Sequence, residues 1–212
     1  MKIGISSRIV SAPNYDEKRD AISHEWPKLL EKLGLIPIII PNVLENVKEF
    51  VENAQIDGLI LSGGDNIGEF IQRDNTEKNL LEFGIKKEIP IIGVCRGMQI
   101  INNYFGGTEI KNNNNDHVNK SHFIKIKQNE FVSLLNKTET KVNSFHNNII
   151  TKEHIGNGLQ IVALDKNDET IEAFSHSKFP IIGVMWHPER EQNEDNLKII
   201  KTFFENKKFW SN

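Results

Sequence analysis

The sequence predicts an α/β protein, a three-layer arrangement in which helices flank a mainly parallel central sheet. Short, nearly continuous apolar segments recur along the first half of the 212-residue chain, and segments with helical spacing of apolar residues separate them. The residues Pro-Ile-Ile-Gly-Val occur at 90–94 and again at 180–184, which indicates two buried strands in similar surroundings. Alternating apolar and polar residues in the second half predict an additional small antiparallel element.

In the first half, each predicted strand is a short apolar run, and each predicted helix follows one of these runs. The strands cover 2–6, 36–40, 58–61 and 90–94, and the helices cover 17–33, 43–54, 76–87 and 98–105. Pro27 kinks the first helix or marks its true start, since proline is tolerated only in the first helical turn. Gly34 supplies the stop signal for this helix.

The second half has weaker periodicity. A half-exposed strand is predicted over 122–127, and the segments 159–164 and 170–174 are predicted to form a hairpin. A buried strand over 180–184 and a helix over 197–206 complete the chain, while the Asn-rich segment at 111–116 indicates a surface loop. Because no segment has the composition of a linker, we predict one domain that covers residues 1–212.

Composition limits the classes of partner. The chain has 26 Lys and Arg against 29 Asp and Glu, so it has no excess positive charge that would favour nucleic acid or an anionic membrane. One cysteine excludes an internal disulfide framework and a zinc-finger-type site. No apolar run has the length of a signal peptide or a membrane span. We therefore expect a cytoplasmic protein with a small-molecule substrate, and a homodimer remains open.

Three predicted strands end in unusual residues: Ser62-Gly63-Gly64-Asp65, then Cys95, then the segment 185–189. If these strands are parallel, their carboxyl ends meet at the edge where open α/β sheets bind ligands. Gly-x-Cys-x-Gly between a strand and a helix is the cysteine form of a nucleophile elbow, with the Arg96 amide as a candidate oxyanion donor. A buried structural thiol is the alternative for Cys95, and position alone does not decide between the two.

His187 and Glu189 favour the catalytic alternative. Residues two apart on an extended segment face the same way, and Pro188 favours an extended conformation at His187. A carboxylate beside an imidazole fixes the imidazole tautomer and stabilises its protonated form. A surface turn would explain this pair alone, but the pair together with Cys95 and the Gly-Gly turn indicates a catalytic triad.

Four sequence blocks, GVCRGMQ, FGGT, VNSFHNN and GVMWHPE, resemble those of the class I glutamine amidotransferase-like family. The resemblance is closer to its free-standing γ-glutamyl hydrolase branch, and it implies a flavodoxin-like fold. It implies Cys95 as nucleophile, His187 as general base and then acid, and Glu189 as the orienting carboxylate. It also implies a substrate-binding set composed of Gly63, Gly64, Arg96, Gln99, Asn143, Ser144, Phe145 and His146, where Gly64 and Arg96 contribute backbone amides.

The same resemblance implies hydrolysis of a γ-glutamyl amide through a γ-glutamyl thioester, with release of glutamate and without a metal or organic cofactor. The leaving group is open. The favoured substrate is γ-glutamyl-CDP-amidate, whose hydrolysis serves phosphoramidate decoration of capsular polysaccharide. The alternatives are γ-glutamyl-γ-aminobutyrate or a γ-glutamyl polyamine, and a glutaminase subunit that serves a separate synthetase.

Several other charged residues are weaker candidates. His117 and His122 lie next to the Asn-rich segment, with no third partner at metal-ligand spacing, and we expect solvated loop histidines. For His146, a structural role is at least as well founded as substrate contact. Arg8, Arg19 and Arg73 are candidates to meet an anionic leaving group, although each is more simply a solvated surface charge.

Overall fold

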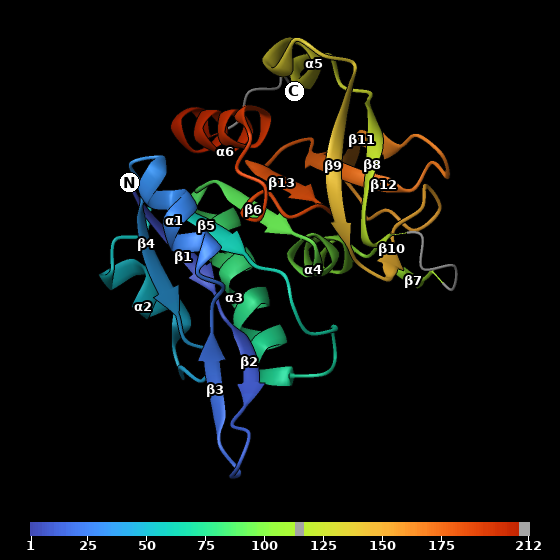
Figure 1. Ribbon diagram of the computed structural model, residues 1–212. Coiled ribbons are helices and arrows are strands. Elements are labelled where there is room, and N and C mark those ends of the chain that lie inside the picture. The colour runs from blue at the N-terminus through green and yellow to red at the C-terminus, as the bar shows by residue number, and fades with distance from the viewer. Residues whose placement is uncertain (113–116, 208–212) are drawn as a thin grey trace.

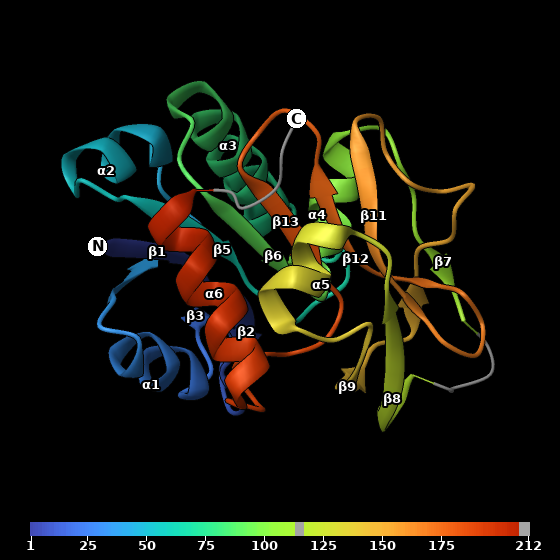
Figure 2. The same ribbon diagram turned by 90° about the horizontal axis from the view of Figure 1, so that it is seen from above.

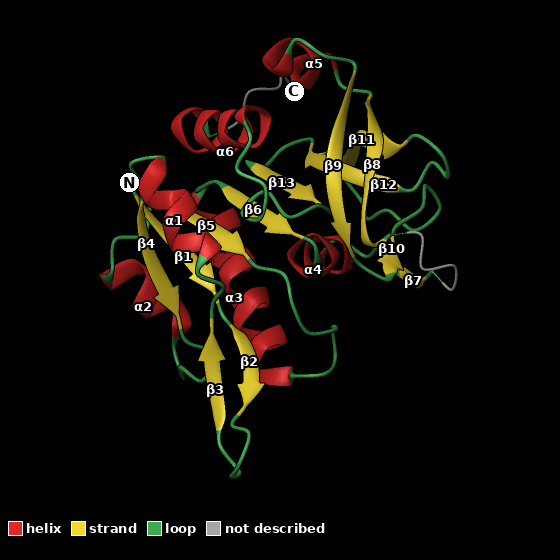
Figure 3. Ribbon diagram, in the orientation of Figure 1, coloured by secondary structure: helices red, strands yellow, loops and turns green. Residues whose placement is uncertain are grey.

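A computed structural model describes residues 1–112 and 117–207, and within them a nine-stranded sheet forms the centre of the molecule (Figures 1 and 3). The strands follow the order β4-β1-β5-β6-β13-β12-β11-β8-β9. The parallel strands are β4 (Ile36–Ile40), β1 (Lys2–Ser6), β5 (Gly58–Leu61), β6 (Ile91–Val94) and β13 (Ile181–Val184). The antiparallel strands are β12 (Ile171–His176), β11 (Leu159–Asp165), β8 (Val118–Ile126) and β9 (Glu139–Phe145). The predicted antiparallel element therefore extends the main sheet.

The register of the parallel strands brings the predicted functional turns to one edge. Gly93 on β6 pairs with Leu61 on β5 and with Gly183 on β13. Because the three strands are parallel and end level with one another, the turns that follow them lie side by side. The edge predicted from the sequence is thus confirmed.

Helices cover both faces of the sheet, as Figure 2 shows from above. The face with α1 (Glu25–Lys32), α5 (Asn129–Leu135) and α6 (Glu194–Asn206) buries a cluster that includes Leu29, Phe131 and Phe203. The opposite face buries a second cluster with side chains from α2 (Val47–Asn53), α3 (Ile71–Lys87) and α4 (Arg96–Tyr104). Since each fully buried large apolar side chain contributes about 1.5–3 kcal/mol, these clusters hold the three layers together. The predicted three-layer α/β class is confirmed.

The predicted helix over 17–33 is wrong in its first half. Residues Lys18–Ala21 form β3, which pairs antiparallel with β2 (Arg8–Ser11) in a hairpin that projects from the sheet in Figure 1. The Asp20 carboxylate accepts hydrogen bonds from the backbone and side-chain N–H groups of Asn42, at 2.9 and 2.5 Å. The helix begins at Glu25, and Pro27 lies in its first turn, where a backbone N–H has no intrahelical acceptor.

Other boundaries differ from the prediction for local reasons. Helix α2 begins later than predicted because the side chain of Asn46 caps it, accepting from the Glu49 N–H at 3.2 Å. Helix α3 begins earlier than predicted. Its first turns bury charged residues, so they lack the apolar spacing from which a helix is predicted. The sequence analysis missed β9, α5 and the short pair β7 (Ile110–Lys111) and β10 (Asn148–Ile149). Most of the predicted Asn-rich loop lies outside the described residues.

Candidate active site

The lone cysteine has a strained backbone at the turn between β6 and α4. Cys95 has φ 53° and ψ −109°, a combination of backbone angles that residues other than glycine rarely adopt. Its N–H donates to the carbonyl of Val184 at 2.8 Å, which ties the turn to the neighbouring strand β13. The thiol therefore sits at the sheet edge, immediately before the N-terminus of a helix, where negative charge is favoured.

The two glycines around Cys95 are required by close packing. A Cβ atom on Gly97 would lie 1.9 Å from the carbonyl oxygen of Leu61, and one on Gly93 would lie 2.5 Å from that of Gly97. No side chain could move to relieve these contacts because the opposing atoms are backbone. The sequence pattern Gly-x-Cys-x-Gly thus reflects the tight approach of α4 to β5 and β6.

His187 and Glu189 form an imidazole–carboxylate pair beside this turn. The Nδ1 atom of His187 lies 2.7 Å from Oε1 of Glu189, and both side chains are buried. Burial by itself lowers the pKa of His187, but the Cys95 thiol and the Glu189 carboxylate raise it to about 9. A Cβ atom on Gly63 would lie 2.8 Å from His187 Cε1 and 3.5 Å from Cys95 Cβ. The structure therefore brings the three strand ends together around one point.

Asn143 on β9 holds the backbone of His187 on both sides. Its Nδ2 donates to the His187 carbonyl at 2.9 Å, and its Oδ1 accepts from the His187 N–H at 2.8 Å. Phe145, two residues further on the same strand, presents its ring at right angles to the imidazole, with 5.8 Å between centroids. Both residues thus contact His187 and fix its position.

Ser144 and His146 point to the other side of β9, which differs from their predicted place beside the substrate. Alternate side chains of a strand face opposite ways, so these two residues cannot share the direction of Asn143 and Phe145. The Ser144 hydroxyl donates to the carbonyl of His117 at 2.6 Å, and His146 stacks on the His117 ring. The sequence segment predicted to line one pocket is therefore divided between two sites.

The Gly63–Gly64 turn has the backbone freedom that an oxyanion-binding loop needs. Gly64 has φ +126°, which excludes other residue types, and a Cβ atom there would lie 2.9 Å from Nη1 of Arg73. Arg73 Nη2 donates to the carbonyls of Ser62 and Gly63 at 2.7 and 3.0 Å. These bonds fix the peptide planes of the turn. The amides of Gly64 and Arg96 remain the predicted oxyanion donors.

Arg73 is fully buried, so the predicted solvated surface charge is wrong. Its Nε lies 3.1 Å from Glu77 Oε1, and its Nη1 lies 3.0 Å from Asp65. The Arg96 side chain forms buried ion pairs with Asp74 and Glu77. Sequence reasoning missed this network, although charged residues at helical spacing before the apolar Leu80 and Leu81 would be a signal for it. The turn at Cys95 and the Gly63–Gly64 turn are thus held by the same network of buried ion pairs.

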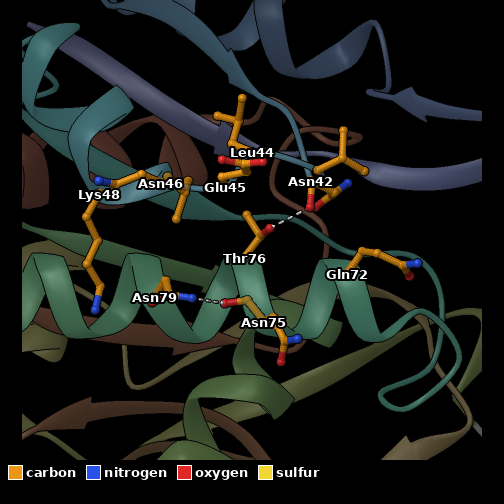
Figure 4. A pocket seen from close by; sticks show the side chains of 11 residues that line it. Asn42, Leu44, Glu45, Asn46, Lys48, Gln72, Asn75, Thr76 and Asn79 are labelled. Carbon is orange, nitrogen blue, oxygen red and sulfur yellow. Dashed lines mark hydrogen bonds between the residues drawn. The ribbon is translucent and has the colours of Figure 1, made fainter.

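Gln99 lies on α4, buried, with its amide 3.9 Å from the sulfur of Met185. A narrow pocket of about 40 Å³ opens beside the His187–Glu189 pair, lined by Gly63, Gly64, His187 and Glu189 together with Arg8, Trp26 and Arg190. The larger hollow of about 370 Å³ in Figure 4 lies between α2 and α3, and five of its eleven lining residues are Asn or Gln. Its lining contains neither a cysteine nor a histidine, whereas His187 and Glu189 line the smaller pocket.

The family model described as Peptidase C26 matches residues 2–189, nearly the whole chain. The chain belongs to the Peptidase C26 family. Membership makes it a cysteine-type amide hydrolase, and the family resemblance seen in the sequence blocks is confirmed.

Relatives of this Peptidase C26 chain include the γ-glutamyl-CDP-amidate hydrolase of Campylobacter jejuni, 36% identical over 96% of this chain and 98% of the relative. One component of the glutamine-hydrolysing GMP synthase of Methanococcus aeolicus is 29% identical over 85% of this chain and 89% of its own. A solved structure from Thermoplasma acidophilum, named as a candidate component of GMP synthase, aligns with a TM-score of 0.77 at 22% identity. It covers 98% of this chain and 94% of the other, which shows a shared fold.

In the described part of this Peptidase C26 chain, every helix is too short or too polar to cross a lipid bilayer.

Proposed function

We propose that the chain hydrolyses γ-glutamyl amides with Cys95, His187 and Glu189 as its catalytic triad, and that γ-glutamyl-CDP-amidate is its substrate. The observation that carries this proposal is the meeting of a strained cysteine turn with the His187–Glu189 pair at one sheet edge. The near full-length similarity to the Campylobacter hydrolase favours this particular substrate. The products are L-glutamate and cytidine diphosphoramidate.

The reaction proceeds in two halves. The Cys95 thiolate attacks the γ-carbonyl carbon, and the backbone amides of Gly64 and Arg96 stabilise the resulting oxyanion. His187 donates its proton to the leaving nitrogen as the C–N bond breaks, and a γ-glutamyl thioester remains on the cysteine. His187 then removes a proton from water, the hydroxide attacks the thioester, and glutamate leaves as the thiolate is restored. Glu189 orients the imidazole through both halves.

The wall of the pocket favours an anionic leaving group. Arg8, on the exposed hairpin strand β2, lines the pocket beside Gly63 and Gly64. Arg190 also lines it, with its guanidinium 4.4 Å above the ring of Phe145. Two guanidinium groups bind phosphate oxygens well and repel a polycation. This arrangement favours a nucleotide diphosphate over a polyamine.

The test is turnover by the purified chain alone, with glutamate release measured for γ-glutamyl-CDP-amidate, γ-glutamyl-γ-aminobutyrate, γ-glutamylputrescine and glutamine. We expect the highest kcat/KM for γ-glutamyl-CDP-amidate. Arg8→Gln should raise KM for this substrate and leave glutamine hydrolysis unchanged, since only the diphosphate would contact the guanidinium. Arg19→Gln is the matched control, because Arg19 lies on the same hairpin but pairs with Glu17. An equal or higher kcat/KM for another of these amides would refute γ-glutamyl-CDP-amidate as the substrate.

A glutaminase component of a separate synthetase is the second candidate function, favoured by the similarity to the GMP synthase component. Such a protein would hydrolyse glutamine slowly on its own and faster with its partner. Glutamine turnover that exceeds turnover of every γ-glutamyl amide, or that depends on an added synthetase, would select this candidate.

The raised pKa of His187 predicts the alkaline limit of activity. Because this pKa lies at about 9 rather than near 6.5, the imidazole keeps its proton through the neutral range and loses it as pH rises through about 9. We expect kcat/KM to fall there, since the leaving nitrogen no longer receives a proton. Glu189→Gln removes one cause of the raised pKa and should move the limit to lower pH. As a control, His24→Gln changes an exposed histidine and should leave the pH profile of kcat/KM unchanged. If the alkaline limit of Glu189→Gln stays at the same pH as in the unaltered chain, the assignment of this limit to His187 is contradicted.

A further inference from the structure

A second group of chemistry-bearing side chains lies at the other side of β9, away from the triad. His117, His122 and His146 surround the carboxylate of Glu172 on β12. Their side chains are 2–8% exposed, and that of Glu172 is fully buried, so the predicted solvated loop histidines at 117 and 122 are wrong. The proposed mechanism uses none of these four residues.

The outer nitrogen of each imidazole is already bound to an acceptor. His117 Nε2 lies 2.8 Å from Asp168 Oδ2, and His122 Nδ1 lies 2.9 Å from Asp165 Oδ2. His146 Nδ1 lies 3.0 Å from the carbonyl oxygen of Asn148. Since all three partners accept hydrogen bonds, each outer nitrogen is a donor, and the inner nitrogen of each ring is the atom that faces Glu172.

The inner atoms converge without satisfying one another. Among the described residues, the inner nitrogens of the three histidines and both oxygens of Glu172 are buried and make no hydrogen bond. The distances from Glu172 oxygens are 3.3 Å to His122, 3.6 Å to His146 and 3.8 Å to His117. Hydrogen bonds of imidazole to carboxylate are shorter, at about 2.7–3.2 Å. A cation bound between these nitrogens and the buried carboxylate would satisfy all of them.

The donor types match a transition metal, and three of the residues have the close spacing of a metal site. One ligand atom each of His117, His122 and Glu172 lies within 4.8 Å of the other two. Ligand atoms around a tetrahedral Zn²⁺ ion lie about 3.3–3.6 Å apart, as follows from bond lengths of about 2.0–2.2 Å. The hydrogen bonds of the outer nitrogens to carboxylates and a carbonyl are the second shell that orients metal-binding histidines. An open pocket of about 380 Å³, lined by His117, His122, Asp165 and Asp168, gives access from the surface.

We propose that His117, His122 and Glu172 bind one divalent transition-metal ion, with Zn²⁺ as the best match, and that His146, whose Nε2 lies 3.6 Å from Glu172 Oε1, completes the set as the fourth ligand. Four protein ligands close a tetrahedral site and leave no position for substrate, so the ion is structural. It joins the start of β8 and the end of β9 to β12. Because Asn143 and Phe145 on β9 contact His187, the ion also secures the strand that positions the catalytic imidazole.

The experiment measures metal content of the full chain, purified without a polyhistidine tag, by plasma mass spectrometry after dialysis. We expect about one Zn²⁺ ion per chain, or one other divalent transition metal, and a lower Tm after treatment with a chelator. Replacement of Zn²⁺ by Co²⁺ should give the visible absorption of a tetrahedral site. This measurement uses the unaltered protein, so a variant that fails to fold does not affect it.

Variants then locate the ion. His122→Ala and Glu172→Gln should each lose the metal and the chelator-dependent change in Tm, whereas His24→Ala, at an exposed histidine, should retain both. A chain that binds no metal and shows no change in Tm with added Zn²⁺ would overturn the proposal. Metal retained in a folded His122→Ala, Glu172→Gln double variant would overturn it as well. Neither result depends on the substrate, so the proposed function is tested separately.

Discussion

Cys95→Ala is expected to lower kcat by about 10⁴-fold or more, because removal of a covalent nucleophile leaves only binding and oxyanion stabilisation. Alanine removes the sulfur and keeps the Cβ atom, so the strained turn retains the same steric demands. Glutamate release from γ-glutamyl-CDP-amidate is the measurement.

Two further observations make this result specific. The circular dichroism spectrum and Tm of Cys95→Ala should stay close to those of the unaltered chain, since the thiol fills little of the core. A thiol reagent should inactivate the unaltered protein with one label per chain, as it contains a single cysteine. Turnover that survives in a folded Cys95→Ala protein would exclude the thioester mechanism.

Glu77→Gln is expected to lower the free energy of unfolding by about 3–5 kcal/mol, the usual cost of removing one partner from a buried ion pair. Glu77 is fully buried and pairs with both Arg73 and Arg96. Burial by itself raises the pKa of Glu77, but the two guanidinium groups hold it below its usual range. The substitution leaves two buried cations with too little negative charge. Urea denaturation followed by circular dichroism measures the effect.

Glu82→Gln is the matched control for this prediction. Glu82 lies on the same helix and pairs with Lys48, but both side chains are exposed, so the loss should be about 1 kcal/mol or less. Because Arg73 also holds the carbonyls of Ser62 and Gly63, Glu77→Gln should lower activity in the protein that remains folded. A stability loss as small as that of Glu82→Gln would show that the buried charges are solvated or paired by other means.

Local sequence was sufficient to predict the layers and the edge that carries the candidate site. Apolar runs such as 58–61 and 181–184 are strands because continuous apolar residues need burial on both faces, and parallel pairing then places their ends together. The glycines beside Cys95 and the His187-x-Glu189 spacing are local features too. Each of these features involves only a few neighbouring residues, so it can be predicted without a structure.

The sequence failed where a residue's environment depends on distant segments. The strand β3 exists because it pairs with β2 and because Asn42 binds Asp20. The residues of β3 are mostly polar, and their sequence gives no sign of either partner. The same is true of β9, which has the sequence ETKVNSF and is a strand because it pairs with β8. Roles of individual residues in the triad and the single-domain organisation stay predictions.

The sequence by itself determined the α/β class, the cysteine turn and the imidazole–carboxylate pair, because these depend on spacing along the chain. Only the tertiary structure decided which way the side chains of β9 face, and therefore that Asn143 holds His187 while His146 joins His117. It also decided that Arg73 and Arg96 are buried and that Glu172 lies among three histidines. The physical reason is that these arrangements join residues from separate elements, and burial and charge pairing arise only when those elements pack together.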